Sequence, residues 1–275
     1  MTMKKFIIVL ILMVAPGIST ASQDIDKAEL IGGLLQEFGI ASLLKEMPEI
    51  IADGLVQRRK EKGDLTPEQY KQVSQILSDE FNPNEMSKRV IDILSQDFDA
   101  TLFSSVKQVI SSPKAKEMLK LKQGAATPQA FTEIKEIAKE HAKNPVDKDK
   151  LELLKQLDDV SAETEFFVAV QALAVNAILQ AMDGLKHKAP AEKEGKEGQY
   201  LNAIYQDLLR PSQYTTMMTF LYTFKDKTNE DMVEYIQIYR MRNVQWFLRK
   251  SMDALTAAAR QTSKDAETKI AGLKL

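Results

Sequence analysis

Apolar residues recur along almost the whole chain at the spacing of one helical face. Ile31, Leu34 and Phe38 lie on one such face, and the stretch 86–94 repeats the pattern. A single apolar stripe of this kind indicates an amphipathic α-helix. Glycine is scarce, and no stretch alternates apolar and polar residues over the length of a strand. The sequence therefore predicts an all-α fold, a bundle of helices.

A hydroxyl residue followed by proline marks several of the expected helix starts. Thr66-Pro67, Ser112-Pro113 and Thr127-Pro128 each offer a side-chain acceptor at the N-cap, then a residue that lacks an amide hydrogen. We expect a charged, exposed loop over 188–198. The helices are expected over 25–38, 42–61, 67–80, 84–97, 100–111, 113–122, 128–142, 147–158, 162–186, 198–210, 212–224 and 229–260.

The most apolar of these helices spans Phe166 to Met182, where the polar residues are Gln171, Asn176 and Gln180. A helix that is apolar nearly all round is typical of a bundle centre, where neighbouring helices cover every face. We expect Leu173 and Ile178 on it to be deeply buried.

An internal repeat is the main sign of organisation. A shift of 123 residues aligns the apolar positions of 30–56 with those of 153–179, and a shift of 111 aligns 90–110 with 201–221. Coincident helical stripes are the alternative explanation. Within the first copy, Pro48 is expected to kink or restart its helix. The repeat predicts two duplicated halves, residues 22–146 and 147–275.

The N-terminus has the pattern of a cleaved signal peptide. Lys4 and Lys5 precede an apolar stretch, and small residues at Ser19 and Ala21 fit signal peptidase. The apolar stretch is shorter than the roughly 20 residues of a membrane span, although an uncleaved anchor is the alternative. We expect residues 1–21 to be removed at Ala21–Ser22. The mature protein would then be periplasmic or secreted, without a transmembrane span.

Around Ser112-Pro113 the chain resembles an uncharacterised family of exported bacterial helical proteins. That family carries an aromatic pair, then Ser-Pro, a variable residue and glycine, at a helix junction. Here Val109 and Ile110 stand at the aromatic positions, and Ala115 stands at the glycine position. The resemblance covers about residues 97–121. It implies an exported all-helical protein and brings no activity with it.

The composition and the missing motifs exclude several kinds of function. A formal net charge of −2 argues against nucleic-acid binding, which needs excess Lys and Arg. The chain has no cysteine, and its two histidines, His141 and His187, lie among lysines. No His-Glu-x-x-His, Gly-x-Ser-x-Gly or Walker sequence occurs. We therefore expect no catalytic, metal or cofactor site.

Aromatic residues supply the candidate binding site. All tyrosines except Tyr70, and the only tryptophan, lie in the second half of the chain. Tyrosine and tryptophan often anchor protein interfaces. Tyr222, Tyr235, Tyr239 and Trp246 are therefore the candidates for a partner-binding surface, and core filling is the alternative.

These features favour a non-enzymatic accessory or scaffold protein of the cell envelope, whose partner is another envelope protein. A carrier that holds a hydrophobic small molecule or lipid between its helices is the alternative, and would need an inter-helix pocket. An enzyme of unfamiliar type would need converging polar groups, which no motif indicates.

Overall fold

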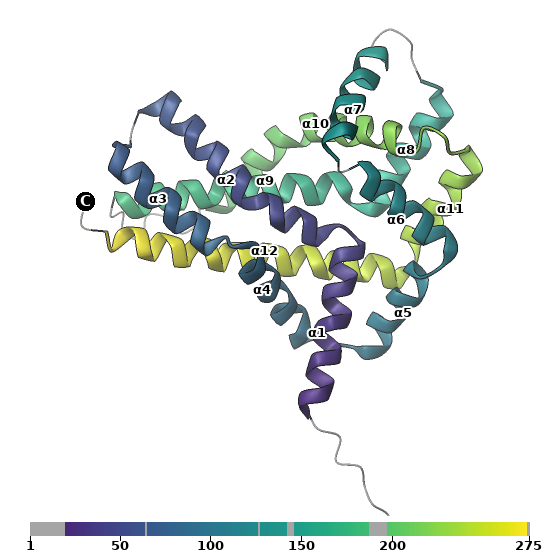
Figure 1. Ribbon diagram of the computed structural model, residues 1–275, viewed down its shortest axis with the longest axis horizontal. Coiled ribbons are helices and arrows are strands. Elements are labelled where there is room, and N and C mark those ends of the chain that lie inside the picture. Colours follow the sequence, from purple (N-terminus) through teal and green to yellow (C-terminus); the bar gives the residue numbers. More distant parts are fainter. Residues whose placement is uncertain (1–19, 64, 126, 142–145, 187–196, 274–275) are drawn as a thin grey trace, which may run out of the picture.

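The computed structural model describes residues 20–63, 65–125, 127–141, 146–186 and 197–273. In these ranges the chain is helical without strands, which confirms the all-α prediction (Figure 1). The helices are α1 (Thr20–Glu37), α2 (Ile40–Lys62), α3 (Pro67–Glu80), α4 (Pro83–Gln96), α5 (Ala100–Ile110), α6 (Pro113–Ala125), α7 (Pro128–His141), α8 (Lys148–Ser161), α9 (Glu163–Leu185), α10 (Glu197–Thr223), α11 (Asn229–Arg240) and α12 (Arg242–Ala271).

Two long helices, α9 and α12, lie side by side across the molecule (Figure 1). They approach closely because small residues line their seam. A Cβ atom at Gly184 on α9 would lie 2.9 Å from the backbone oxygen of Glu267 on α12. α2 and α10 also pack on α9, so that Leu173 and Ile178 are buried as predicted.

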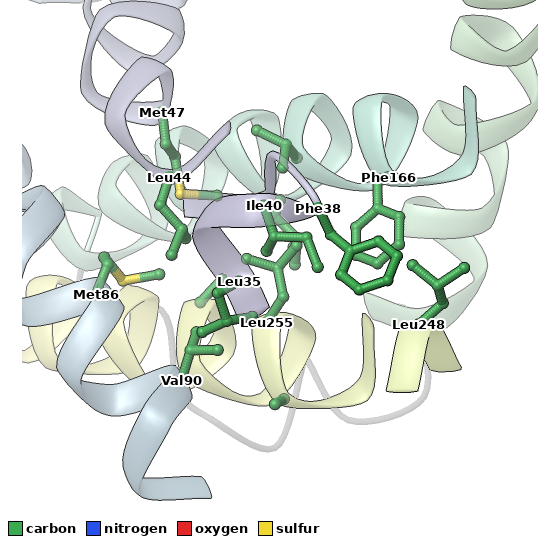
Figure 2. Packing of buried hydrophobic residues seen from close by; sticks show 14 of the residues in the cluster. Leu35, Phe38, Ile40, Leu44, Met47, Met86, Val90, Phe166, Leu248 and Leu255 are labelled. Carbon is green, nitrogen blue, oxygen red and sulfur yellow. The ribbon is translucent and has the colours of Figure 1, made fainter. Parts of the chain in front are cut away.

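The remaining helices surround this pair. α3, α4 and α5 pack on α12, and α1 packs on α2, α4 and α5. Figure 2 shows Leu35, Val90 and Leu255, from α1, α4 and α12, converging in the core. α11 packs on α8 and α6, and α7 packs on α10. One hydrophobic core therefore links residues from both halves of the sequence.

Local side-chain chemistry explains many helix starts. Thr66 and Gln69 form a reciprocal capping box at α3, and the Ser112 hydroxyl accepts from the Ala115 amide at α6. Asp99 and Asp147 accept backbone amides at the starts of α5 and α8. These caps occupy amide groups that have no partner within the helix.

One expected boundary between helices is absent. The helices expected over 198–210 and 212–224 form one helix, α10, with Pro211 inside it. Proline removes only one helical hydrogen bond, and packing against α6, α7, α8 and α9 holds α10 together along its length. α2 runs through Pro48 as one helix, so of the kink or restart expected there the restart does not occur.

The helix expected over 229–260 is instead two helices, because Met241 is extended with φ −60° and ψ 134°. The side chain of Gln245 donates to the backbone oxygens of Tyr239 and Val160, at 2.8 and 2.6 Å. It thereby satisfies a carbonyl next to the break. α12 then continues past the expected end, to Ala271.

The proposed halves share one local feature and differ in another. The α1–α2 and α8–α9 corners each contain a residue with left-handed backbone, Gly39 with φ 79° and Ala162 with φ 56°. These positions are equivalent under the predicted shift. However, α4 and α5 are separate helices, whereas the aligned segment is the continuous α10. The fold does not establish the duplication, and the halves 22–146 and 147–275 stay a prediction.

Several expectations concern residues outside the described ranges. They include His187, most of the signal peptide predicted over 1–21 and most of the loop predicted over 188–198. Within the described ranges, α9 is long and apolar enough to cross a membrane by length and composition. Of its most apolar stretch, 61% is buried inside the protein, as is typical of a core helix.

Candidate functional site

The structure separates the four aromatic residues predicted to form a partner-binding surface. Tyr235 and Tyr239 are buried, with 0% and 2% of their surface exposed. Tyr222 and Trp246 are partly exposed and lie on different helices, α10 and α12. A single surface made of all four residues is therefore wrong, because α11 turns its two tyrosines into the core.

Tyr239 is fixed from two sides. Its ring packs edge-on against Phe38, with the ring centroids 6.1 Å apart. Its hydroxyl accepts from the Lys122 ammonium at 3.3 Å, and Lys122 also contacts the Glu163 carboxylate at 2.5 Å. Burial would lower the pKa of Lys122, but Glu163 and Tyr239 outweigh that effect and the pKa is raised. This group ties α6, α9 and α11 together.

Tyr235 lies one turn earlier on α11. Burial and the nearby Glu117 carboxylate raise the pKa of its hydroxyl to about 12. The hydroxyl is itself buried close to that carboxylate. The Lys114 ammonium lies 5.5 Å from the ring centroid and pairs with Asp231 at 2.7 Å. Both buried tyrosines thus take part in contacts between α6 and α11.

Tyr222 is near the end of α10, and Lys225 lies 5.0 Å from its ring centroid. It does not line the hollow that surrounds Trp246. No second aromatic candidate extends its exposed side, because Tyr235 and Tyr239 are buried. Tyr222 alone therefore gives a weaker case for a site than Trp246.

Trp246 lines an open groove of about 200 Å³ between α4, α5 and α12. The groove has an apolar floor and charged residues at its rim. Its lining residues are Ile93, Leu94, Asp97, Phe103, Trp246, Lys250, Asp253, Ala254 and Ala257.

Stacked aromatic rings hold Trp246 in place. Phe103 meets the indole edge-to-face, with centroids 5.2 Å apart and an angle of 86°. Phe103 is itself buried and contacts Phe98 at 4.9 Å and Phe247 at 6.0 Å. A partly exposed ring on such a support is preorganised, because little side-chain freedom remains to be lost on binding.

The rim of the groove carries more negative than positive charge. The Lys250 ammonium lies 3.4 Å from the Asp97 carboxylate, in a pair whose side chains are 42% and 81% exposed. Asp253 is exposed and has no ion pair within the described ranges. Asp97 is also the C-cap of α4, where the negative end of the helix dipole lies. Two carboxylates and one ammonium therefore surround the aromatic floor.

A second hollow, of about 280 Å³, lies between α2 and α3. It is lined by Val56, Arg59, Lys60 and Tyr70. The Arg59 guanidinium lies 4.9 Å from the Tyr70 ring centroid, so the chain itself occupies the aromatic face there. This hollow lacks a buried support comparable to Phe103 and is the weaker candidate.

The described ranges contain no group of three or more His, Cys, Asp or Glu residues placed to hold a metal ion. His141 lies at the end of α7, where its Nδ1 accepts from the Val146 amide at 3.3 Å.

Sequence reasoning found Trp246 but missed the other groove residues. One signal was available, because Trp246, Lys250 and Asp253 are spaced i, i+4 and i+7 and so share one helical face. Asp97 and Phe103 come from other helices, and only the packing of α4 and α5 on α12 brings them there. Compared with family models, curated proteins and solved structures, the chain gave no match.

Proposed function

We propose that this chain is an exported, non-enzymatic helical protein of the cell envelope that binds another envelope protein at the Trp246 groove. The observation that carries the proposal is a partly exposed tryptophan, supported by the buried Phe103, in an open groove. Tryptophan in a preformed hollow is a frequent energetic anchor of protein interfaces. Envelope localisation rests on the predicted signal peptide at residues 1–21.

The shape of the hollows favours a protein partner over the alternative, a carrier of a hydrophobic small molecule or lipid. A site that buries most of a small ligand usually has about 300–1,000 Å³ of concave space. The hollow between α2 and α3 and the Trp246 groove measure about 280 and 200 Å³, and both are open to solvent. A groove of this size fits one or two side chains of a protein surface.

Site-specific photo-crosslinking in cells tests the proposed site. A photoreactive phenylalanine at Ala257, which lines the groove and is exposed, should give a crosslinked product of one defined mass. The same residue at Val233, on the exposed side of α11, is the matched control and should give none. The product should disappear when Trp246→Ala is added to the Ala257 variant.

Circular dichroism must show that the doubly substituted protein still melts cooperatively. If that folded protein crosslinks as before, or if the Val233 control gives the same product, docking at the groove is wrong.

A further inference from the structure

We infer that the Trp246 groove receives an arginine side chain of the partner protein, with the guanidinium on the indole face and paired with the rim carboxylates. The inference rests on the proposed function and names the chemical group that the groove recognises. It follows from the aromatic floor, the charge of the rim and a cation that the same corner already binds.

The indole ring at the floor of the groove can bind a cation. The face of an indole ring is electron-rich and attracts a cation within about 6 Å of its centroid more strongly than the face of phenylalanine or tyrosine. Phe103 meets Trp246 edge-to-face at 86°, and the indole is partly exposed in the groove. The indole is thus held in place with part of its surface open to the groove, and there a flat guanidinium can stack on it.

The carboxylates at the rim of the groove can pair with the same cation. Asp253 has no ion pair in the described ranges, and Asp97 has only an exposed contact of 3.4 Å with Lys250. Exposed pairs of this kind stabilise proteins little and exchange readily. The negative end of the α4 dipole adds to the attraction for a cation. An incoming guanidinium can thus pair with Asp253 and compete with Lys250 for Asp97.

The same corner already binds one cation of the chain. The Lys27 ammonium lies 5.6 Å from the ring centroid of Phe98, which stacks on Phe103. It also donates to the backbone oxygen of Ser95, near the end of α4, at 2.9 Å. An aromatic ring next to the carboxyl end of α4 therefore already binds a cation, and Trp246 is a second ring in contact with the same Phe103.

Arginine fits the groove better than an apolar side chain or lysine. An apolar side chain would remove water from Asp253 and leave its charge without a partner, which is costly. The lysine ammonium is compact and strongly hydrated, whereas the guanidinium is planar and pairs with carboxylates through two parallel hydrogen bonds. The groove thus selects for a flat cation.

The tryptophan provides the readout, because it is the only one in the chain and gives one indole N–H signal. We would titrate the purified, ¹⁵N-labelled protein with acetyl-Gly-Arg-Gly-amide and follow that signal by NMR. Matched peptides with citrulline or leucine in place of arginine keep the length and remove the charge. The arginine peptide should shift the signal saturably and bind about fivefold more tightly than either control.

Two carboxylate variants test whether the arginine peptide binds at the rim of the groove. Asp253→Asn removes the free rim carboxylate and should weaken binding of the arginine peptide about threefold. Asp207→Asn, at an exposed carboxylate of α10, is the matched control and should leave binding unchanged. Equal weakening by both substitutions would mean that only net charge matters, which overturns the inference.

Two further outcomes separate this inference from the proposed function. If the leucine peptide binds as tightly as the arginine peptide, or the arginine peptide gives no saturable shift, the arginine inference is wrong. A crosslink at Ala257 that still requires Trp246 would then leave protein docking in place. Loss of both the peptide response and the crosslink would reject the groove as a site altogether.

Discussion

The α1–α2 corner and the α8–α9 corner make the same kind of turn with different residues. Gly39 adopts its left-handed backbone freely, whereas Ala162 is strained there by roughly 1–2 kcal/mol. At the second corner Asp158 accepts from both the amide and the hydroxyl of Thr164, at 2.9 and 2.6 Å. The residues at the equivalent positions of the first corner, Leu35 and Ala41, cannot form such a clamp. One corner therefore relies on backbone freedom and the other on side-chain hydrogen bonds.

The helices that follow these corners also differ. α2 buries a single stripe, which includes Leu44, Met47 and Ile51, and its other faces are exposed or partly exposed. α9 is buried on most of its faces because α2, α10 and α12 pack around it. Aligned sequence positions can therefore contribute very differently to stability, according to how many neighbouring helices cover them.

The first prediction tests whether α9 contributes more to the free energy of unfolding than α2. Leu173→Ala on α9 should lower the free energy of unfolding by about 2–5 kcal/mol, because the side chain is 4% exposed. Ile50→Ala, at the aligned position of α2, should cost only about 1–2 kcal/mol because Ile50 is partly exposed. Urea denaturation of both variants measures the gap. Equal losses would show that α2 is as central as α9.

The next effect concerns the crossing of α2 and α9. A Cβ atom at Gly54 would lie 2.6 Å from Cδ1 of Ile178, so this terminal methyl group must shift. The overpacking should offset the gain in helix propensity and leave Gly54→Ala up to about 1 kcal/mol less stable than the wild type. Gly33→Ala is the matched control on α1, where a Cβ atom meets nothing within 4 Å. It should stabilise the protein by about 0.5–1 kcal/mol, since alanine favours helix.

Shortening Ile178 to valine removes Cδ1 and should restore part of the loss in the Gly54→Ala variant. If the combined variant shows additive losses instead, the two residues do not meet at the crossing.

Substituting the left-handed residue of each corner tests how much backbone strain each turn contains. Gly39→Ala should cost about 1 kcal/mol because alanine must adopt a positive φ. Ala162→Gly should gain up to about 1 kcal/mol by relieving the same strain. Shifts of the two thermal midpoints in opposite directions are expected. A loss for both variants would show that the methyl group of Ala162 contributes more through packing than its backbone loses through strain.

The smallest effect is the pH dependence of the Asp158 clamp. Burial raises the pKa of Asp158 above its ordinary 3.8, although the hydrogen bonds from Thr164 oppose this change. A raised folded-state pKa means that the protonated acid is favoured in the folded protein. The contribution of Asp158 to stability is therefore fully present below pH 3.8 and declines as the pH rises through its folded pKa.

Thermal melts of the wild type and of Asp158→Asn across this pH range isolate that contribution, because all other carboxylates are shared. The stability of the wild type relative to the variant should fall with increasing pH. A constant difference between the two proteins contradicts the raised pKa.

Local chemistry made much of the fold predictable from the sequence. The capping pattern at Thr66 and the Ser112-Pro113 junction placed helix starts correctly because caps act within one turn. The break at Met241 was not predictable in this way. The backbone oxygen of Tyr239, next to the break, accepts from the side chain of Gln245, which also donates to the backbone oxygen of Val160. The contact with Val160 exists only after α8 and α12 have packed.

The candidate site was predictable only in part, for a related reason. Trp246 follows from its residue type, but Asp97 and Phe103 reach the groove through tertiary packing. A sequence pattern does indicate the burial of Tyr235 and Tyr239, since both lie on one helical face with Met232. That stripe favours the core-filling alternative for these two tyrosines.

α12 follows α3, α4 and α9 in the sequence, and this order has a consequence for biosynthesis. This helix of 30 residues packs against α3, α4, α5, α8, α9 and α11, so it completes the core of both halves. Chains are made from the N-terminus, and segments fold early only where their own contacts suffice. The apolar stripes of α3, α4 and α9 therefore lack the contacts that α12 provides until α12 has been synthesised. Until α12 is made, these stripes stay partly exposed to solvent, and a chaperone can bind them.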